Sequence, residues 1–397
     1  MKRILAVIML VMMLFTAASA ETKADPNENR NIQLAEVSDH TAPAGESPTT
    51  GRQLADLEIP KGAAGLAVTG RYMPMMVQIS NPLDDKTKAS GCGNRSPWGL
   101  QYADVIYELQ LHVNGETRMS ALFSDIIPEA VGPIRSARMG NVWLREEWDC
   151  GFMYYGQQEY KQTNVIDAFR DLGADNKGLL FPGTVGSGKP WKSYYETYVS
   201  KRLHNSQLKK PNHVSGNAAE ISKMIDPVMQ ATNHTWLFTD EKYTGGDSGV
   251  KVYVNWGRKD TNSYFTYDAE KDVYIRSVES AAKKSKPVVW AELESQEPFT
   301  FNNVIIQWAP TVFLGNDAPV VGNVKTTIKN TKGQTVSFDG EGNAEIFMNG
   351  RHIAGYWKRL GMNQRTVFYD ENGQEIQFQR GTTFIVQMNT EKEVIYE

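Results

Sequence analysis

The stretch "ADVIYELQLHVNGETRMSALFSD", residues 103–125, contains two runs with the composition of β-strands. The runs are ADVIYELQLHV, residues 103–113, and TRMSALFSD, residues 117–125. Both are short and rich in aliphatic and aromatic residues, which is typical of strands in a sheet. Since consecutive strands are commonly neighbours, we expect the two runs to lie side by side.

Further strands and helices are indicated on both sides of this pair. The runs MPMMVQIS (73–80) and GFMYYG (151–156) have the composition of strands. Helical periodicity begins at Met139 and recurs in TNVIDAFRDLG (163–173) and GNAAEISKMI (216–225). This mixture predicts an α+β or α/β fold, a mixed sheet with helices, for an N-terminal domain over residues 66–234.

The sequence changes character at about residue 235. Short, often alternating runs follow one another up to residue 397, among them VKVYVNW, SYFTYD, DVYIRSV, NNVIIQWA and TTFIVQM. Asn349-Gly350 and Asn372-Gly373 are strong signals for hairpin turns. Almost no helix is indicated, so we predict a β-rich C-terminal domain over residues 235–397 and a two-domain protein.

The first residues have the features of a signal peptide. Lys2 and Arg3 precede an apolar run, Ile4–Phe15, and Ala18-Ser19-Ala20 matches a cleavage site. The apolar run is shorter than the roughly 20 residues that a transmembrane helix needs. We expect residues 1–20 to be removed, leaving a secreted, extracytoplasmic chain with no transmembrane segment. No cysteine adjoins the cleavage site, so no lipid anchor is expected.

Residues 21–65 differ in composition from the predicted domains. They are polar, contain four prolines and have almost no aromatic residues. Such segments bury too little apolar surface to offset the entropy lost on ordering. This composition predicts a disordered linker between the signal peptide and the N-terminal domain.

Charge and cysteine content exclude several classes of function. The net charge is -4 and the pI is about 6.0, which argues against a nucleic-acid binder. No spacing for a metal site or a cofactor is visible, so neither is predicted. The two cysteines, Cys92 and Cys150, are expected to form a disulfide, because cysteines of exported proteins usually pair.

A second stretch, AVGPIRSARMGNVWLREEW (130–148), places two arginines where a helix is expected to start. Ser136 is a suitable N-cap for this helix. A helix N-terminus carries a partial positive charge, so Arg135 and Arg138 are each disfavoured there by up to about 1 kcal/mol. Their presence indicates that an anion lies nearby.

Other charged residues are expected close to these arginines. Asp104 and Glu108 point to the same side of the first strand, and Arg118 lies at the start of the next. Pairing of the strands brings all of them towards one sheet edge. Two interpretations remain open: a structural ion-pair network, since unpaired buried charges are costly, or an anion-binding cleft with a carboxylate beside it.

These residues resemble a known family, the YerB-like bacterial envelope proteins, a lipoprotein family with domains of unknown function. The N-terminal resemblance is carried by Gly99, Leu100, Ala103, Asp104, Tyr107, Glu108, Thr117, Arg118, Gly132, Pro133, Arg135, Ser136, Ala137 and Arg138. The C-terminal resemblance is carried by FTYDAEKDVYIR, NNVIIQ, AEIFMNGRHIAGYWKR and TVFYDENGQEIQFQRGTTFIV. It implies an α/β N-terminal domain, a β-rich C-terminal domain and a cell-envelope location.

This chain departs from the family in two places. The lipid-bearing cysteine is missing, and Pro211-Asn212-His213 replaces the usual Pro-His-Asn. We assign His213 a supporting role in the candidate site, together with Asp104 and Ser136.

Two hypotheses for function follow from these residues. In the first, a non-catalytic envelope protein binds an anionic envelope component or a protein partner through Arg118, Arg135 and Arg138. In the second, an enzyme acts on a phosphate- or carboxylate-bearing envelope substrate, with Glu108 as acid or base and the arginines as clamps. We favour the first, and neither nucleic acid nor membrane-spanning partners are expected.

Overall fold

The computed structural model describes most of the chain after the predicted signal peptide. The described residues are 21–36, 39–81, 96–160, 163–175, 177–184, 188–201, 212–232, 234–279, 286–309, 311–313, 319–321, 325–329, 335–337 and 340–397. The signal peptide predicted at residues 1–20 lies outside them. So does Cys92, one of the two cysteines expected to pair.

The main sheet combines strands from both halves of the chain. Over the described residues it has eleven strands in the order β12-β24-β23-β18-β27-β3-β4-β2-β5-β8, with β25 paired to β24. The first half contributes β2 (Met75–Ser80), β3 (Val105–Gln110), β4 (Thr117–Phe123), β5 (Gly151–Tyr154) and β8 (Leu180–Pro182). The second half contributes β12 (Asp247–Ser248), β18 (Asn303–Trp308), β23 (Gly340–Met348), β24 (Arg351–Arg359), β25 (Val367–Tyr369) and β27 (Thr383–Met388).

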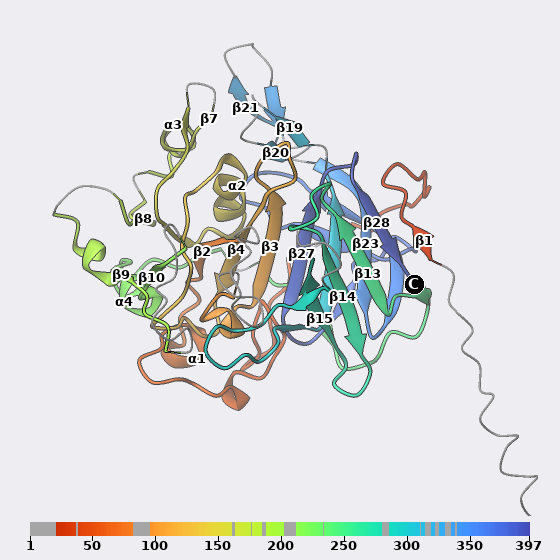
Figure 1. Ribbon diagram of the computed structural model, residues 1–397, viewed down its shortest axis with the longest axis horizontal. Coiled ribbons are helices and arrows are strands. Elements are labelled where there is room, and N and C mark those ends of the chain that lie inside the picture. The colour runs from red at the N-terminus through yellow and green to blue at the C-terminus, as the bar shows by residue number, and fades with distance from the viewer. Residues whose placement is uncertain are drawn as a thin grey trace, which may run out of the picture.

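The two halves meet where β27 runs parallel to β3, as Figure 1 shows near the middle of the molecule. Val386 lies opposite Glu108 in this pairing. On its other side β3 is antiparallel to β4, so the predicted mixed sheet is confirmed. The domain boundary between residues 234 and 235 stays a prediction. Strands from both sides of this boundary share one sheet.

A second, antiparallel sheet belongs mainly to the C-terminal half. It contains β1 (Thr22–Lys23), β13 (Lys251–Asn255), β14 (Ser263–Asp268), β15 (Val273–Val278), β16 (Val288–Val289), β17 (Thr300–Phe301) and β28 (Glu393–Tyr396). The remaining strands form isolated pairs: β6 (Glu159–Tyr160) with β7 (Thr163–Asn164), β9 (Tyr195–Thr197) with β10 (Val214–Gly216), β11 (Leu237–Thr239) with β26 (Gln377–Gln379), β19 (Thr311–Phe313) with β20 (Pro319–Val321), and β21 (Lys325–Lys329) with β22 (Thr335–Ser337).

The predicted helices are present but short. The α-helices are α1 (Leu66–Thr69), α2 (Met139–Trp148), α3 (Val165–Asp171) and α4 (Ala218–Ser222), and single 3-10 turns are η1 (Leu54–Asp56), η3 (Leu100–Tyr102) and η4 (Pro190–Tyr194). The N-cap expected at Ser136 is wrong. Arg138 holds that position, because the Asn141 side chain accepts its backbone N–H at 2.6 Å.

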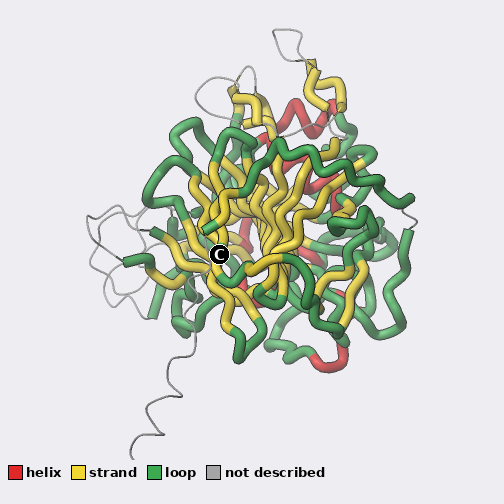
Figure 2. Tube along the Cα trace, turned by 90° about the vertical axis from the view of Figure 1, so that its right-hand side faces the viewer, coloured by secondary structure: helices red, strands yellow, loops and turns green. Residues whose placement is uncertain are grey.

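The core lies on both faces of the main sheet. On one face Tyr107 and Leu109 pack with residues of α2 such as Trp148, whose indole N–H donates to the Tyr107 hydroxyl at 2.9 Å. On the opposite face Ile106 packs in a cluster that includes Phe265 of the second sheet. Figure 2 shows the strands running through the centre of the molecule. The residues of β3 are therefore buried on both faces.

The segment predicted to be a disordered linker is ordered in its described residues, 21–36 and 39–65, which we call the N-terminal strap. The Arg30 side chain is only 7% exposed and pairs with Glu345 at 2.7 Å. The hydroxyls of Ser47 and Thr50 donate to Asp125 at 2.6 and 2.7 Å. The prediction of disorder is wrong, because polar groups in both halves of the chain satisfy the polar residues of the strap.

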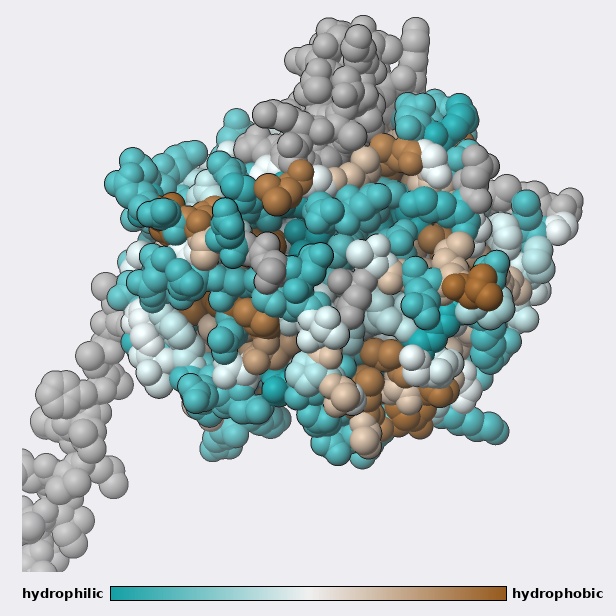
Figure 3. Space-filling view, turned by 180° about the vertical axis from the view of Figure 1, so that it is seen from behind, coloured by the Kyte–Doolittle hydropathy of each residue, from teal (hydrophilic) through white to brown (hydrophobic). Residues whose placement is uncertain are grey.

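The surface is mainly hydrophilic, and its apolar residues form separate patches on the face shown in Figure 3. The most exposed large apolar side chains among the described residues are Val228, Leu360 and Val199. None of the helices in the described part of the chain combines the length and apolar character needed to cross a bilayer.

Candidate functional site

Arg118 lies at the centre of the predicted anion site. It is the second residue of β4, paired with Leu109 of β3 and with Ser80 of β2. Its side chain is buried, and one guanidinium nitrogen donates to the carbonyl oxygen of Ser136 at 2.6 Å. Arg118 is thus held in place by the loop that carries the other two arginines.

Arg135 and Arg138 lie on the loop between β4 and α2, and both side chains are half-buried. The Arg135 backbone bonds to neighbours on two sides, donating to the Gln78 carbonyl at 2.9 Å and accepting from the Tyr155 N–H at 3.0 Å. Its side-chain Nε is buried and has no hydrogen-bond partner in the described part of the chain. Arg138 is the N-cap of α2 and donates from its side chain to the Ala137 carbonyl at 3.1 Å.

Arg135 and Arg138 are both close enough to repel Arg118. Burial, followed by the charges of Arg138 and Arg135, holds the pKa of Arg118 well below its ordinary value. Burial also lowers the pKa of Arg135. Within the described residues no carboxylate forms an ion pair with Arg118 or Arg135. Of the residues expected to converge, the three arginines therefore lie together, whereas Asp104 and Glu108 lie elsewhere.

Glu108 does not belong to this cluster. It is completely buried and forms an ion pair at 3.0 Å with Arg276 of β15, which is also completely buried. Its other carboxylate oxygen accepts from Thr117 at 2.6 Å and from Asn81 at 3.1 Å. The expectation that Glu108 lies with the arginines at one sheet edge is wrong, because Glu108 pairs with Arg276 instead. Its burial suits a structural ion pair rather than a group that meets a substrate.

Asp104, predicted as a supporting residue, lies in a separate buried group with Asp125. It accepts hydrogen bonds from the Ser124 hydroxyl at 2.8 Å and from the Asp125 N–H at 3.1 Å. Burial and then the charge of Asp125 raise the pKa of Asp104 well above its ordinary value. Asp104 therefore lies beside Asp125, which contacts the strap, and not in the arginine cluster.

The remaining predicted residues lie nearer to the arginines. Ser136 accepts the Arg118 hydrogen bond with its carbonyl and donates from its hydroxyl to the Tyr155 carbonyl at 3.2 Å. His213 is half-buried, and its neighbour Asn212 accepts from the Ser80 hydroxyl at 3.0 Å. Since Ser80 is paired with Arg118, the segment carrying His213 adjoins the cluster.

The predicted disulfide is not shown. Cys150 is fully buried and forms no disulfide within the described residues, and burial raises the pKa of its thiol to about 12. Cys92 lies outside the described residues. Pairing of the two cysteines therefore stays a prediction.

Sequence reasoning missed Arg276 and Asn81, the partners of Glu108. A signal for Arg276 exists in the alternation of DVYIRSV, because Tyr274, Arg276 and Val278 lie on one buried face of β15. A charged residue on an inward face requires a partner. The pattern did not indicate that this partner lies 168 residues away in the chain.

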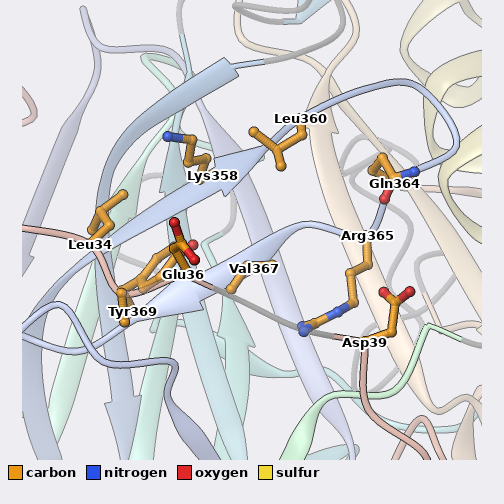
Figure 4. Close-up of a pocket in the computed structure, with 10 residues that line it drawn as sticks. Leu34, Glu36, Asp39, Lys358, Leu360, Gln364, Arg365, Val367 and Tyr369 are labelled. Carbon is orange, nitrogen blue, oxygen red and sulfur yellow. The ribbon is translucent and has the colours of Figure 1, made fainter.

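The hollow shown in Figure 4 lies elsewhere, between the strap and strands β24 and β25. Its volume is about 360 Å³ and it includes none of the predicted anion-site residues. Its cations have carboxylate partners: Arg365 pairs with Glu375 at 2.6 Å and Lys358 with Glu341 at 3.2 Å. This hollow therefore offers less unpaired positive charge than the arginine cluster.

Comparison with known proteins relates both halves of the chain to one family. Residues 68–215 match the N-terminal domain, and residues 252–385 the C-terminal domain, of a family described as "Protein of unknown function (DUF3048)". The chain is 25% identical over 292 residues to the "Putative lipoprotein YerB" of Bacillus subtilis (strain 168). This match covers 72% of this chain and 75% of the relative.

A solved structure has the same overall fold. The crystal structure of the YerB protein from Bacillus subtilis matches with a TM-score of 0.61, covering 89% of this chain and 99% of that chain. The two are 20% identical over this match, so the likeness concerns the fold alone.

Proposed function

Because the chain belongs to the YerB-like family, we propose that it is an extracytoplasmic protein of the bacterial envelope that binds an anionic component through Arg118, Arg135 and Arg138. The relative's description as a lipoprotein supports the location, as does the signal-peptide pattern in residues 1–20. The proposed role is binding rather than catalysis.

One observation carries this proposal. Arg118 and Arg135 lack a carboxylate partner within the described residues, and the Nε of Arg135 is buried without a hydrogen bond. Keeping like charges together in a partly buried place is unfavourable unless an anion joins them. Guanidinium groups bind phosphate and carboxylate through paired, charge-assisted hydrogen bonds. An external phosphate or carboxylate group would therefore relieve the repulsion.

The geometry of Glu108 gives no support to the enzymatic alternative. A catalytic acid or base must reach the reacting group within about 3 Å or through one water. Glu108 is completely buried and engaged by Thr117, Asn81 and Arg276. No other observation favours a catalytic role for it.

A pull-down on bacterial envelope fractions tests the proposal. The purified mature chain, Arg135→Ala and Arg170→Ala are each immobilised and incubated with the lipid, glycan and protein fractions. Arg170 is a matched control because it is exposed on α3 and pairs only with Asp167 among the described residues. We expect one anionic component to be retained by the wild type and by Arg170→Ala but lost from Arg135→Ala. Equal retention by all three proteins would contradict the arginine site.

A further inference from the structure

A second cavity lies at the opposite end of β3 from the arginine cluster. It has a volume of about 340 Å³ and lies where the strap, η3 and the segment between β16 and β17 meet. Leu100, in its wall, precedes β3, whereas Arg118 is paired with Leu109 near the end of that strand. The lining residues come from both halves of the chain, and junctions of this kind often hold small ligands.

The floor of this cavity is apolar. Leu100, Phe299 and Phe301 line it and are each at most 4% exposed. The Phe299 ring also packs on the buried Trp290, with ring centroids 4.6 Å apart. The floor is therefore fixed by the core, and it suits a small aliphatic group more than a fully polar molecule.

Charged groups of both signs surround this floor. Arg52, from the strap, has no ion pair within the described residues. Its side chain donates to the Thr382 hydroxyl at 3.5 Å, and its charge also acts on Asp125. Glu297 is exposed and also has no ion pair in the described part of the chain. Glu292 is buried in the same wall. One unpaired cation and one unpaired carboxylate thus come from different segments of the same cavity.

The loop that carries Glu297 is held in one conformation by its own hydrogen bonds. The Glu292 carboxylate accepts the backbone N–H groups of Glu294 and Ser295 at 2.8 and 2.6 Å. The Gln296 side chain donates to the Glu292 carbonyl at 2.9 Å, and the Ser295 hydroxyl accepts the Glu297 N–H at 3.2 Å. A wall ordered in advance loses little entropy when a ligand binds.

We propose that this cavity binds a small zwitterion, an amino acid or a dipeptide, with its carboxylate on Arg52 and its ammonium group on Glu297. The chemistry matches at three points: a guanidinium for a carboxylate, a carboxylate for an ammonium group, and an apolar floor for a short side chain. The volume falls in the range of roughly 300–1,000 Å³ found for ligand pockets. This site is independent of the anion site at Arg118.

Calorimetric titration with L-alanyl-L-alanine and two analogues tests the proposal on the full mature chain. The N-acetyl analogue lacks the ammonium group, and the C-terminal amide lacks the carboxylate. We expect the dipeptide to bind and each analogue to bind at least tenfold more weakly. This comparison needs no variant, so it does not depend on how any substitution folds.

Variants then assign each end of the ligand. Arg52→Ala should weaken dipeptide binding at least tenfold but leave the affinity for the amide analogue unchanged. Glu297→Gln should weaken dipeptide binding similarly but leave the affinity for the acetyl analogue unchanged. The control Arg170→Ala should bind as the wild type does. Two results would overturn the proposal. One is that no dipeptide binding is detected at 10 mM, taken as about the weakest affinity of interest; the other is that all three compounds bind with equal affinity.

Discussion

The Glu108 carboxylate in β3 and the Arg276 guanidinium in β15 form an ion pair at 3.0 Å, and both side chains are completely inaccessible to solvent. Arg276 also lies over the Trp290 and Phe384 rings, 4.9 and 5.5 Å from their centroids. The pair thus connects the N-terminal half of the main sheet to the second sheet. Its partners are buried charges, so each depends on the other.

Removing one member of this pair should destabilise the protein strongly. Glu108→Gln or Arg276→Met leaves a buried charge without its partner, which typically costs about 3–5 kcal/mol in the free energy of unfolding. The double variant Glu108→Leu, Arg276→Leu should recover much of that loss, because no charge is left stranded. Urea unfolding monitored by tryptophan fluorescence provides the values. Losses below about 1 kcal/mol in both single variants, the level of an exposed pair, would contradict this account.

The strap should contribute to stability through Arg30. Arg30→Ala leaves the buried Glu345 with fewer partners and should cost about 3 kcal/mol. Lys23→Ala is the matched control, since Lys23 is an exposed residue of the same strap that pairs with Glu393. It should change the free energy of unfolding by less than about 1 kcal/mol. Equal effects of the two substitutions in urea unfolding would mean that the strap is not anchored at Arg30.

Glu345 also predicts a dependence of stability on pH. Burial alone raises the pKa of Glu345, but the His352 hydrogen bond and the Arg30 charge outweigh it, leaving the pKa below the ordinary 4.5. The folded protein therefore releases this proton more readily than the unfolded chain. The stabilisation is fully present above pH 4.5 and is lost as pH falls through the lowered pKa. Glu345→Gln should make the free energy of unfolding depend less on pH in this acid range. If the pH dependence is the same in the variant and the wild type, Glu345 is not its source.

Asp104 and Asp125 predict the opposite slope. Burial, and then the charge of Asp125, raise the pKa of Asp104 well above its ordinary value of 3.8. The folded state then holds this proton more tightly, so the contribution of Asp104 to stability is greatest below pH 3.8 and declines as pH rises towards the raised pKa. Asp104→Asn removes this titration and should reduce the decline. Urea unfolding at a series of pH values measures it, and a variant with the same decline as the wild type would rule out this carboxyl.

The strands and the main helix were predictable because their periodicity is local. The runs at residues 103–113 and 117–125 contain β3 and β4, and the helix expected at Met139 begins there. Local patterns record which face of an element is apolar, and burial of that face is what stabilises it. The start of α2 differed only in its N-cap.

The strap and the partner of Glu108 were not predictable from local patterns. The strap is polar, and its order comes from contacts such as those of Ser47 and Thr50 with Asp125, more than seventy residues away. A polar composition leads to disorder only when the polar groups of the segment find no partners in the rest of the fold. The grouping of three arginines near one sheet edge could likewise be predicted. Which arginine forms the ion pair with Glu108 could not, because it depends on how the distant strand β15, which carries Arg276, packs against the main sheet.

The reactivity of Cys150 tests the fold near α2. The thiol is fully buried and its pKa is raised to about 12 by burial, so it should not react with Ellman's reagent in the native protein. Unfolding in denaturant without reductant should release reactive thiols. Absence of thiols even after unfolding would show instead that Cys150 is paired with Cys92.

The central claim, that the arginine cluster binds an anion, is tested most directly by calorimetric titration with inorganic phosphate at constant ionic strength. The wild type and Arg170→Ala should bind phosphate, and Arg135→Ala should bind it at least tenfold more weakly. The free energy of unfolding of Arg135→Ala should be unchanged or slightly raised, because Arg135 has no described carboxylate partner and repels Arg118. Unaltered phosphate affinity in Arg135→Ala, or a loss of several kcal/mol of stability, would contradict the anion site.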